Sequence, residues 1–238
     1  MIAFFDVDET VVDTKSMFDF LRFTLAEDGD DGDAYQERAG RLHRAAARGV
    51  PRAEVNRAYY RLYAGARWSD LMAAGRRWYA DLCGRDRPFI AEGLCAHDRH
   101  RAAGYATVLV SGSFRPCLEP LAAHLGASEI LCTEPVLDPD GRLTGEVHRP
   151  MIGDNKRAAV LELIDRWGAG PADCYGYGDH SSDLPFLAEV GYPAVIGSNP
   201  ELLATAAARG WRTYPATPCP APPLPAGGVL GLADSGRR

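Results

Sequence analysis

The chain has 238 residues, 46% of them hydrophobic, and carries a formal net charge of −6 at pH 7. The apolar fraction suffices for one folded domain with an insertion, and the negative charge argues against a nucleic-acid-binding surface. The apolar runs are too short to cross a bilayer and no charged-then-apolar signal segment opens the chain, so we expect a cytoplasmic protein that works without nucleic acid or membrane.

The first predicted strand covers residues 2–5 and runs into Asp6-Val7-Asp8-Glu9-Thr10. Two carboxylates this close repel each other unless a cation, a shared proton or strong hydrogen-bond donors hold them. Mg2+ is the simplest such cation, because it accepts oxygen ligands and binds phosphate oxygens at the same time. Taken alone, the pattern Asp-x-Asp-x-Thr is equally compatible with an acidic turn, so the rest of the chain has to decide between the two.

Residues 14–87 lack strand patterns and carry apolar residues at three- and four-residue spacing, as at Met17, Phe18, Leu21 and Leu25. This spacing is typical of amphipathic helices. We expect a cap of about four helices that closes over the site and excludes water. The aromatic side chains of this segment are expected in its own core rather than around a ligand.

Further strand-like runs alternate with helical stretches after the cap. The strands are predicted at 107–110, 129–132, 173–177 and 194–196, and the helices between them include 116–125 and 155–167. Short, continuous apolar strands between helices predict a buried parallel sheet that binds ligands at the carboxyl ends of its strands. A hairpin turned by Asp140-Gly141 is expected at 136–144.

Polar groups suited to phosphate chemistry follow these strands in order. Ser111-Gly112-Ser113 offers a hydroxyl and a backbone that can approach an anion closely. Lys156 opens a predicted helix and could neutralise both a nucleophilic carboxylate and an incoming phosphate. Asp179 and Asp183 lie one helical turn apart, as a metal ligand and its supporting partner would. Each piece alone could be an ordinary loop or surface residue, but together they indicate a phosphoryl-transfer site.

These residues resemble the four motifs of the haloacid dehalogenase superfamily, in its phosphoserine phosphatase-like subfamily IB, over about residues 1–214. The resemblance implies an α/β fold: a Rossmann-like parallel-sheet core with helices on both faces, formed by 1–13 and 88–214. The segment 14–87 would be an inserted helical cap domain. The Pro- and Gly-rich tail, 215–238, is expected to be disordered.

The resemblance also implies a role for each motif residue. Asp6 would be the nucleophile that forms an aspartyl-phosphate, and Asp8 the acid that protonates the leaving oxygen and then the base that activates water. The other implied roles are charge neutralisation by Lys156, phosphate binding by Thr10, Ser111 and Gly112, Mg2+ binding by Asp6, the Asp8 carbonyl oxygen and Asp179, and support from Asp183.

We therefore predict a Mg2+-dependent phosphatase acting on a small phosphorylated metabolite. In the phosphoserine phosphatases that this chain resembles, a glutamate nine residues after the nucleophile would bind the substrate ammonium, and here that position is Lys15. A lysine would repel an ammonium, so free phosphoserine is a poor candidate. Lys15 would suit a carboxylate, a second phosphate or a hydroxyl-rich group, and Arg115 and His180 are further specificity candidates. Two alternatives stay open: a phosphotransferase that passes the phosphoryl group to an acceptor alcohol, and a non-catalytic binding module.

Overall fold

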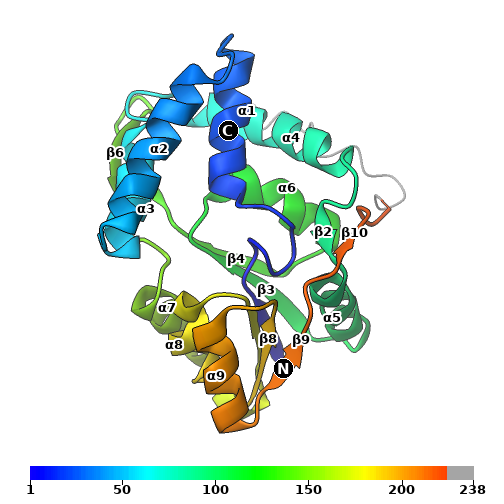
Figure 1. The fold of residues 1–238 in the computed structure, drawn as a ribbon. Helices are drawn as coiled ribbons and strands as arrows, with labels where there is room; N and C mark the ends of the chain where they lie inside the picture. The colour runs from blue at the N-terminus through cyan, green and yellow to red at the C-terminus, as the bar shows by residue number, and fades with distance from the viewer. Residues whose placement is uncertain (224–238) are drawn as a thin grey trace.

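A computed structural model describes residues 1–223, and its centre is a six-stranded parallel sheet with the strand order β4-β3-β1-β7-β8-β9 (Figure 1). The predicted α/β fold with a Rossmann-like parallel core is confirmed. The short outer strand β9 was not predicted, because its three residues carry no apolar run. In sheet order the strands are β4 (Glu129–Cys132), β3 (Ala106–Ser111), β1 (Ile2–Phe5), β7 (Tyr175–Gly178), β8 (Tyr192–Ile196) and β9 (Arg212–Tyr214).

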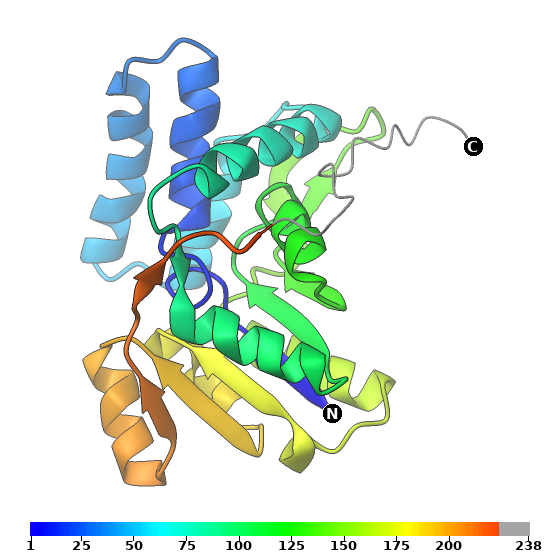
Figure 2. The ribbon, with the colours of Figure 1, turned by 90° about the vertical axis from the view of Figure 1, so that its right-hand side faces the viewer.

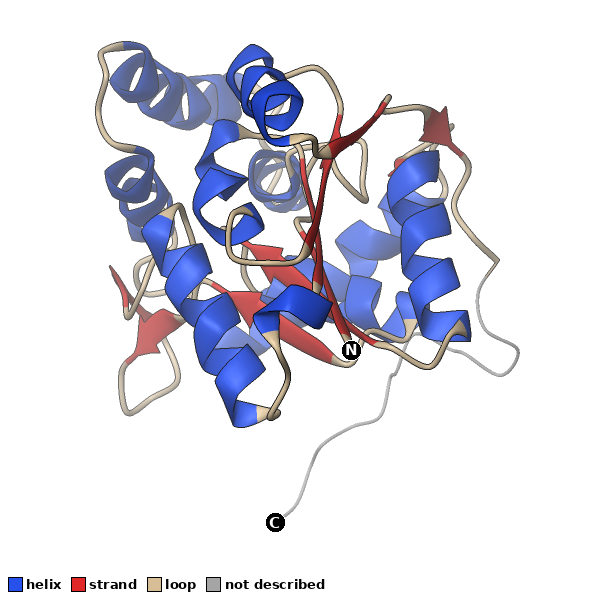
Figure 3. Ribbon diagram, turned by 90° about the horizontal axis from the view of Figure 1, so that it is seen from below, coloured by secondary structure: helices blue, strands red, loops and turns tan. Residues whose placement is uncertain are grey.

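Helices lie on both sides of the sheet, so strand β1 is buried on both of its faces (Figure 3). Ala3 and Phe5 point into one hydrophobic cluster, and Ile2 and Phe4 point into the other. This double burial explains why the strand is a continuous apolar run rather than an alternating one. The first cluster packs under α5 (Ala91–Ala102) and α6 (Arg115–Leu125), and the second under α7 (Asp154–Arg166), α8 (Leu184–Leu187) and α9 (Pro200–Arg209).

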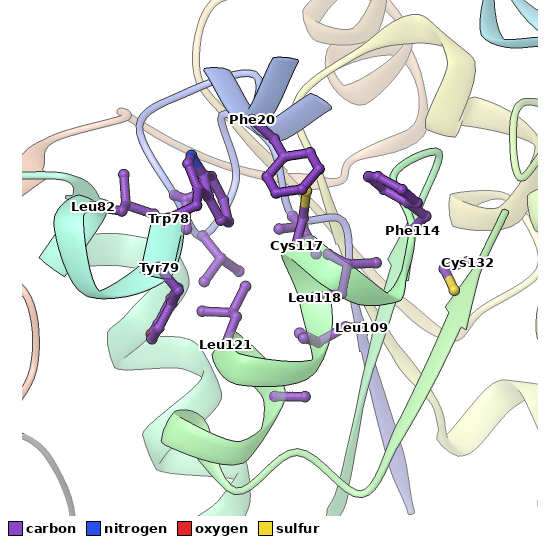
Figure 4. Packing of buried hydrophobic residues seen from close by; sticks show 14 of the residues in the cluster. Phe20, Trp78, Tyr79, Leu82, Leu109, Phe114, Cys117, Leu118, Leu121 and Cys132 are labelled. Atoms are coloured by element: carbon purple, nitrogen blue, oxygen red, sulfur yellow. The ribbon is translucent and has the colours of Figure 1, made fainter. Parts of the chain in front are cut away.

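Four helices between β1 and β2 (Phe89–Ile90) stand over the carboxyl ends of the strands (Figure 1). Their core is continuous with the first cluster, where Trp78 and Tyr79 of the cap lie near Leu118 and Leu121 of α6 (Figure 4). Of the aromatic side chains predicted to form the cap core, Tyr59, Tyr60, Tyr63, Trp78 and Tyr79 are buried and Trp68 is partly buried, while Tyr59 also lines the cavity described below. At Gly75, in the fourth cap helix, a Cβ atom would lie 2.0 Å from the Pro116 carbonyl oxygen of α6. Glycine therefore allows this cap helix to pack closely against α6. The cap helices are α1 (Ser16–Glu27), α2 (Asp33–Ala47), α3 (Arg52–Arg61) and α4 (Trp68–Cys83).

The predicted hairpin is confirmed as the antiparallel pair β5 (Pro135–Leu137) and β6 (Leu143–Val147). It contacts the cap through backbone hydrogen bonds: the Gly65 N–H donates to the Leu143 carbonyl oxygen at 2.7 Å, and the Trp68 N–H to that of Gly141 at 2.9 Å. The hairpin, which follows the cap in the sequence, is thereby bonded to the segment between α3 and α4.

The start of the tail is ordered, which corrects the expectation that all of 215–238 is disordered. Strand β10 (Pro218–Cys219) pairs antiparallel with β2 (Phe89–Ile90), and the two lie side by side in Figure 2. The Thr217 N–H and hydroxyl both donate to the Glu92 carboxylate, at 2.9 and 2.7 Å. These contacts outweigh the local bias of a Pro-rich sequence towards disorder. The remainder of that expectation, at 224–238, lies outside the described residues. Within residues 1–223 no helix has the length and apolar character that a bilayer crossing needs.

Candidate active site

The end of strand β1 brings Asp6 and Asp8 to one cavity. The Asp6 N–H donates to the Tyr177 carbonyl oxygen in β7, 2.9 Å away. The chain then coils tightly, with Glu9 at a φ of 60°, in the left-handed region that residues other than glycine rarely occupy. The N–H groups of the three residues after Glu9 lie within 3.3 Å of the Val7 carbonyl oxygen. Because of this coil, both carboxylates line the same cavity.

Lys156, in the first turn of α7, supplies a buried cation. Only 3% of its side chain is exposed, and its Nζ donates to Asp183 Oδ1 at 2.7 Å and also to Asp6 Oδ1. Burial alone lowers the pKa of this ammonium, but the Asp183 and Asp6 carboxylates outweigh burial and raise the pKa above its usual value. Lys156 therefore stays charged and offsets the negative charge of Asp6.

Three carboxylates converge beyond the ends of β1 and β7. One oxygen from each of Asp6, Asp179 and Asp183 lies within 4.8 Å of the others. Burial, and then repulsion from Asp6 and Asp183, raises the pKa of Asp179 to about 9. A hard divalent cation such as Mg2+ fits this cluster, because it prefers oxygen ligands and would offset the charges that repel one another.

Asp8 has different surroundings from Asp6. Its Oδ1 atom is buried and has no hydrogen-bond partner in the described part of the chain. Burial raises the pKa of the Asp8 carboxyl to about 7, although a hydrogen bond from Ser16 acts in the opposite direction. A carboxyl that gains and loses a proton near neutral pH is suited to general acid and base catalysis.

Ser111 ends β3 and Gly112 begins the loop after it, and both line the cavity that Asp6 and Asp8 line. The Ser113 N–H donates to Ser111 Oγ at 3.1 Å. The Gly112 carbonyl oxygen accepts hydrogen bonds from Asn56 Nδ2 (2.8 Å), the Tyr60 hydroxyl (3.1 Å) and the Thr133 hydroxyl (2.9 Å). Two of these donors belong to cap helix α3 and the third to the core, so the loop is fixed from both sides.

A cavity of about 260 Å3 lies between the cap and the ends of the strands. Of the predicted specificity residues, Lys15 and His180 line it. Lys15 Nζ also pairs with Glu9 at 2.9 Å, which offsets part of its charge. His180 Nε2 lies 2.8 Å from Arg52 Nη1 of the cap, and burial together with the Arg52 charge lowers the His180 pKa. The predicted residues that line this cavity are Asp6, Asp8, Lys15, Ser111, Gly112, Lys156, Asp179 and His180.

Three predicted site residues, Thr10, Arg115 and Asp183, do not line the cavity. Thr10 is fully buried, and its hydroxyl donates to Asp179 Oδ1 at 3.4 Å. It does not line the cavity in which a phosphate would lie. Arg115, the first residue of α6, pairs with Glu134 at 3.1 Å and does not line this cavity. Asp183 is buried behind Lys156.

Three further residues at or beside the cavity, Asn56, Arg52 and Thr133, were not among the predicted site residues. Asn56 and Arg52 line the cavity from helix α3, and Thr133 joins Gly112 to the backbone N–H of Met151, which donates to the Thr133 hydroxyl at 2.9 Å. No motif marks these residues. Their position depends on where α3 lands on the core, and helical periodicity alone does not specify that.

Comparisons with known proteins bear on the family and the fold. Residues 3–188 match the family model described as haloacid dehalogenase-like hydrolase. The chain is 31% identical to the "inhibition of morphological differentiation protein" of Streptomyces azureus, over 88% of this chain and 76% of that protein. It is 36% identical to a probable phosphatase of Mycobacterium tuberculosis over 112 residues, which are 47% of this chain and 39% of that relative. A substrate-bound phosphoserine phosphatase structure shares the fold, with a TM-score of 0.66, 16% identity and coverage of 92% of this chain and 93% of that one.

Proposed function

The chain belongs to the haloacid dehalogenase-like hydrolases, and we propose that within this family it is a phosphatase that hydrolyses a small phosphomonoester, with Mg2+, through an aspartyl-phosphate. The observation that carries this proposal is the contrast between two neighbouring carboxylates. Asp6 pairs with the Lys156 ammonium, as a nucleophile should, whereas burial raises the pKa of Asp8 to about 7, as an acid and base requires.

In the first half of the reaction, an Asp6 carboxylate oxygen attacks phosphorus. A new bond forms between Asp6 and phosphorus while the ester bond between phosphorus and the alcohol oxygen breaks. Asp8 gives its proton to that oxygen, so that the alcohol leaves neutral. The Ser111 hydroxyl and the Gly112 backbone N–H bind phosphoryl oxygens.

In the second half, Asp8 is a carboxylate and takes a proton from a water molecule. The water oxygen bonds to phosphorus, the bond to Asp6 breaks, and inorganic phosphate leaves with Asp6 and Asp8 restored. Lys156 offsets the negative charge around Asp6 throughout, and Asp183 holds Lys156 in place at 2.7 Å. Asp6, Asp179 and the Asp8 carbonyl oxygen would hold Mg2+, which supplies further charge neutralisation when bound.

The substrate that we propose is a small phosphorylated metabolite other than free phosphoserine. The cap residues that line the cavity include Lys15 and Arg52, two cations that would repel a substrate ammonium. A leaving group with an anionic or hydroxyl-rich part meets less repulsion there.

The test is a screen of phosphorylated metabolites with Mg2+, run on the wild type, on Asp6→Asn and on Asp13→Asn. Asp13 is an exposed acid close in sequence and outside the cavity, so it serves as a matched control. We expect phosphate release by the wild type and by Asp13→Asn. Asp6→Asn should be inactive, because an amide is a poor nucleophile. Wild-type activity in Asp6→Asn would refute the covalent mechanism.

The same screen separates hydrolysis from transfer. Phosphate released in buffer without any added alcohol supports a hydrolase. Turnover that requires an added alcohol and yields its phosphate ester would support the phosphotransferase instead.

A further inference from the structure

The Gly112 carbonyl oxygen carries an unusual number of hydrogen bonds. Three side chains donate to it within 3.1 Å: Asn56 and Tyr60 from cap helix α3, and Thr133 from the loop after β4. A carbonyl oxygen has two lone pairs, so three donors exceed what satisfying a buried acceptor requires. The arrangement strongly polarises the peptide group that joins Gly112 to Ser113.

The donors are held in donating states. Tyr60 is fully buried, and this burial raises the pKa of its phenol far above its usual value, so the hydroxyl keeps its proton. The Thr133 hydroxyl accepts the Met151 N–H at 2.9 Å, which leaves its own hydrogen for Gly112. Asn56 contacts the Gly112 carbonyl oxygen through its amide nitrogen, which can only donate.

The other end of the same peptide group reaches the phosphate site. Its N–H belongs to Ser113 and donates to Ser111 Oγ at 3.1 Å. Polarising a carbonyl strengthens the N–H of its peptide as a donor, because hydrogen bonds in a chain reinforce one another. Ser111 Oγ therefore accepts from the loop behind it, and its own hydrogen is free to point into the cavity that Ser111 lines.

We propose that Asn56, Tyr60 and Thr133 are positioning residues that act through the Gly112–Ser113 peptide to aim the Ser111 hydroxyl at the phosphoryl group. The inference rests on the proposed function in one respect, that the ligand beside Ser111 is a phosphoryl group. Two of the three donors belong to the cap, so this phosphate site is complete only while α3 is docked. Cap docking and phosphate binding therefore strengthen each other.

Tyr60→Phe and Thr133→Val test the proposal most cleanly, because each removes one hydroxyl and neither residue lines the cavity. Tyr63→Phe and Thr107→Val are matched controls. The Tyr63 hydroxyl contacts that of Tyr59 at 3.2 Å, and the buried Thr107 hydroxyl has no hydrogen-bond partner in residues 1–223. With p-nitrophenyl phosphate and Mg2+, we expect each test variant to lose about 3- to 10-fold in kcat/KM, the worth of one hydrogen bond, and each control to stay within about 2-fold.

A double-mutant cycle with Ser111→Ala distinguishes positioning from a general effect on the fold. If Tyr60 acts through Ser111, Tyr60→Phe has no further effect on kcat/KM in the Ser111→Ala background. The same fold loss in both backgrounds, or an equal loss in Tyr63→Phe, would overturn the proposal.

Binding of inorganic phosphate, measured as thermal stabilisation in Mg2+, gives a readout without turnover. We expect phosphate to stabilise Tyr60→Phe and Thr133→Val less than the wild type and both controls. If no phosphomonoester is hydrolysed but phosphate still stabilises the wild type in this Tyr60- and Ser111-dependent way, the proposed function fails and the positioning network stands. Hydrolysis with equal phosphate stabilisation in all variants would refute the network alone.

Discussion

Lys156 Nζ donates to Asp183 Oδ1 at 2.7 Å while it also contacts Asp6, so one ammonium joins the carboxylate after β1 to the one that follows β7. All three side chains are at least nine-tenths buried. Buried charges are tolerated only while they are paired, because each has given up its hydration. The contact that we propose prepares Asp6 for attack therefore also joins the segments that follow two neighbouring strands of the sheet.

The first prediction concerns the loss of this ammonium. Lys156→Met leaves Asp6 and Asp183 buried without their cation, and we expect the free energy of unfolding to fall by about 3–5 kcal/mol, together with loss of phosphatase activity. Urea unfolding in EDTA measures the change. Lys15→Met is the control, because it breaks the exposed pair with Glu9, and we expect it to cost about 1 kcal/mol or less. Equal losses of unfolding free energy in the two variants would contradict a stabilising role for the buried Lys156 ammonium.

The second prediction concerns Asp179 and pH in the metal-free protein. Its pKa is raised from 3.8 to about 9, first by burial and then by Asp6 and Asp183. Above pH 4 the unfolded chain releases this proton, but the folded chain holds it until about pH 9, so the fold loses stability as pH rises through that window. Asp179→Asn removes the penalty, and we expect its gain in Tm over the wild type to be larger at pH 8 than at pH 5.

Mg2+ should stabilise the wild type more than it stabilises Asp179→Asn. At pH 8 it should raise the Tm of the wild type, because it binds the charged carboxylates, and raise that of Asp179→Asn much less. Asp165→Asn, at an exposed position on α7, controls for the general loss of a negative charge. A Tm gain in Asp179→Asn that does not change between pH 5 and pH 8 would be evidence against the charge cluster.

The parts of the site that sequence predicts are those with local signals. Asp6, Ser111 and Asp179 each come at the end of a predicted strand. The apolar run predicts where the strand ends, and the polar residue at that end is then a candidate site residue. The Asn56 contact with Gly112 joins residues 56 positions apart, and it depends on how the cap docks. No periodic pattern encodes that. Thr10 matches its motif in type and position, yet its hydroxyl faces Asp179, because the coil around Val7 sets its direction.

The third prediction concerns the ordered start of the tail. Burial alone raises the Glu92 pKa, but the Thr217 donors outweigh burial and lower it. A lowered pKa means that this contact stabilises the fold above the ordinary pKa of glutamate and loses that effect as pH falls through the lower, folded value. Relative to a chain ending at Pro223, we expect a chain ending at Tyr214 to lose about 1–2 kcal/mol of unfolding free energy at pH 7.

The point variant Glu92→Ala isolates this contact. It should account for part of the loss at pH 7 and have a smaller effect at pH 3, where the carboxylate is increasingly protonated in both states. Glu201→Ala, at an exposed position in α9, is the control for removing a surface glutamate. If the chain ending at Tyr214 unfolds at the same urea concentration as the chain ending at Pro223, then β10 adds nothing to the stability of the fold.

The fourth prediction concerns Lys15 and Glu9, whose side chains are about half exposed and pair at 2.9 Å beside the cavity. If Lys15 faces an anionic leaving group, Lys15→Gln raises KM for 2-phosphoglycolate, and Glu9→Gln lowers it, because it removes the carboxylate that competes for the ammonium. We expect changes of about 2- to 5-fold, with kcat less affected, that shrink at high salt because the pair is exposed. p-Nitrophenyl phosphate, whose leaving group lacks a carboxylate, is the reference substrate. Equal KM changes for both substrates would remove Lys15 from substrate selection, since its charge would then act on the shared phosphate instead.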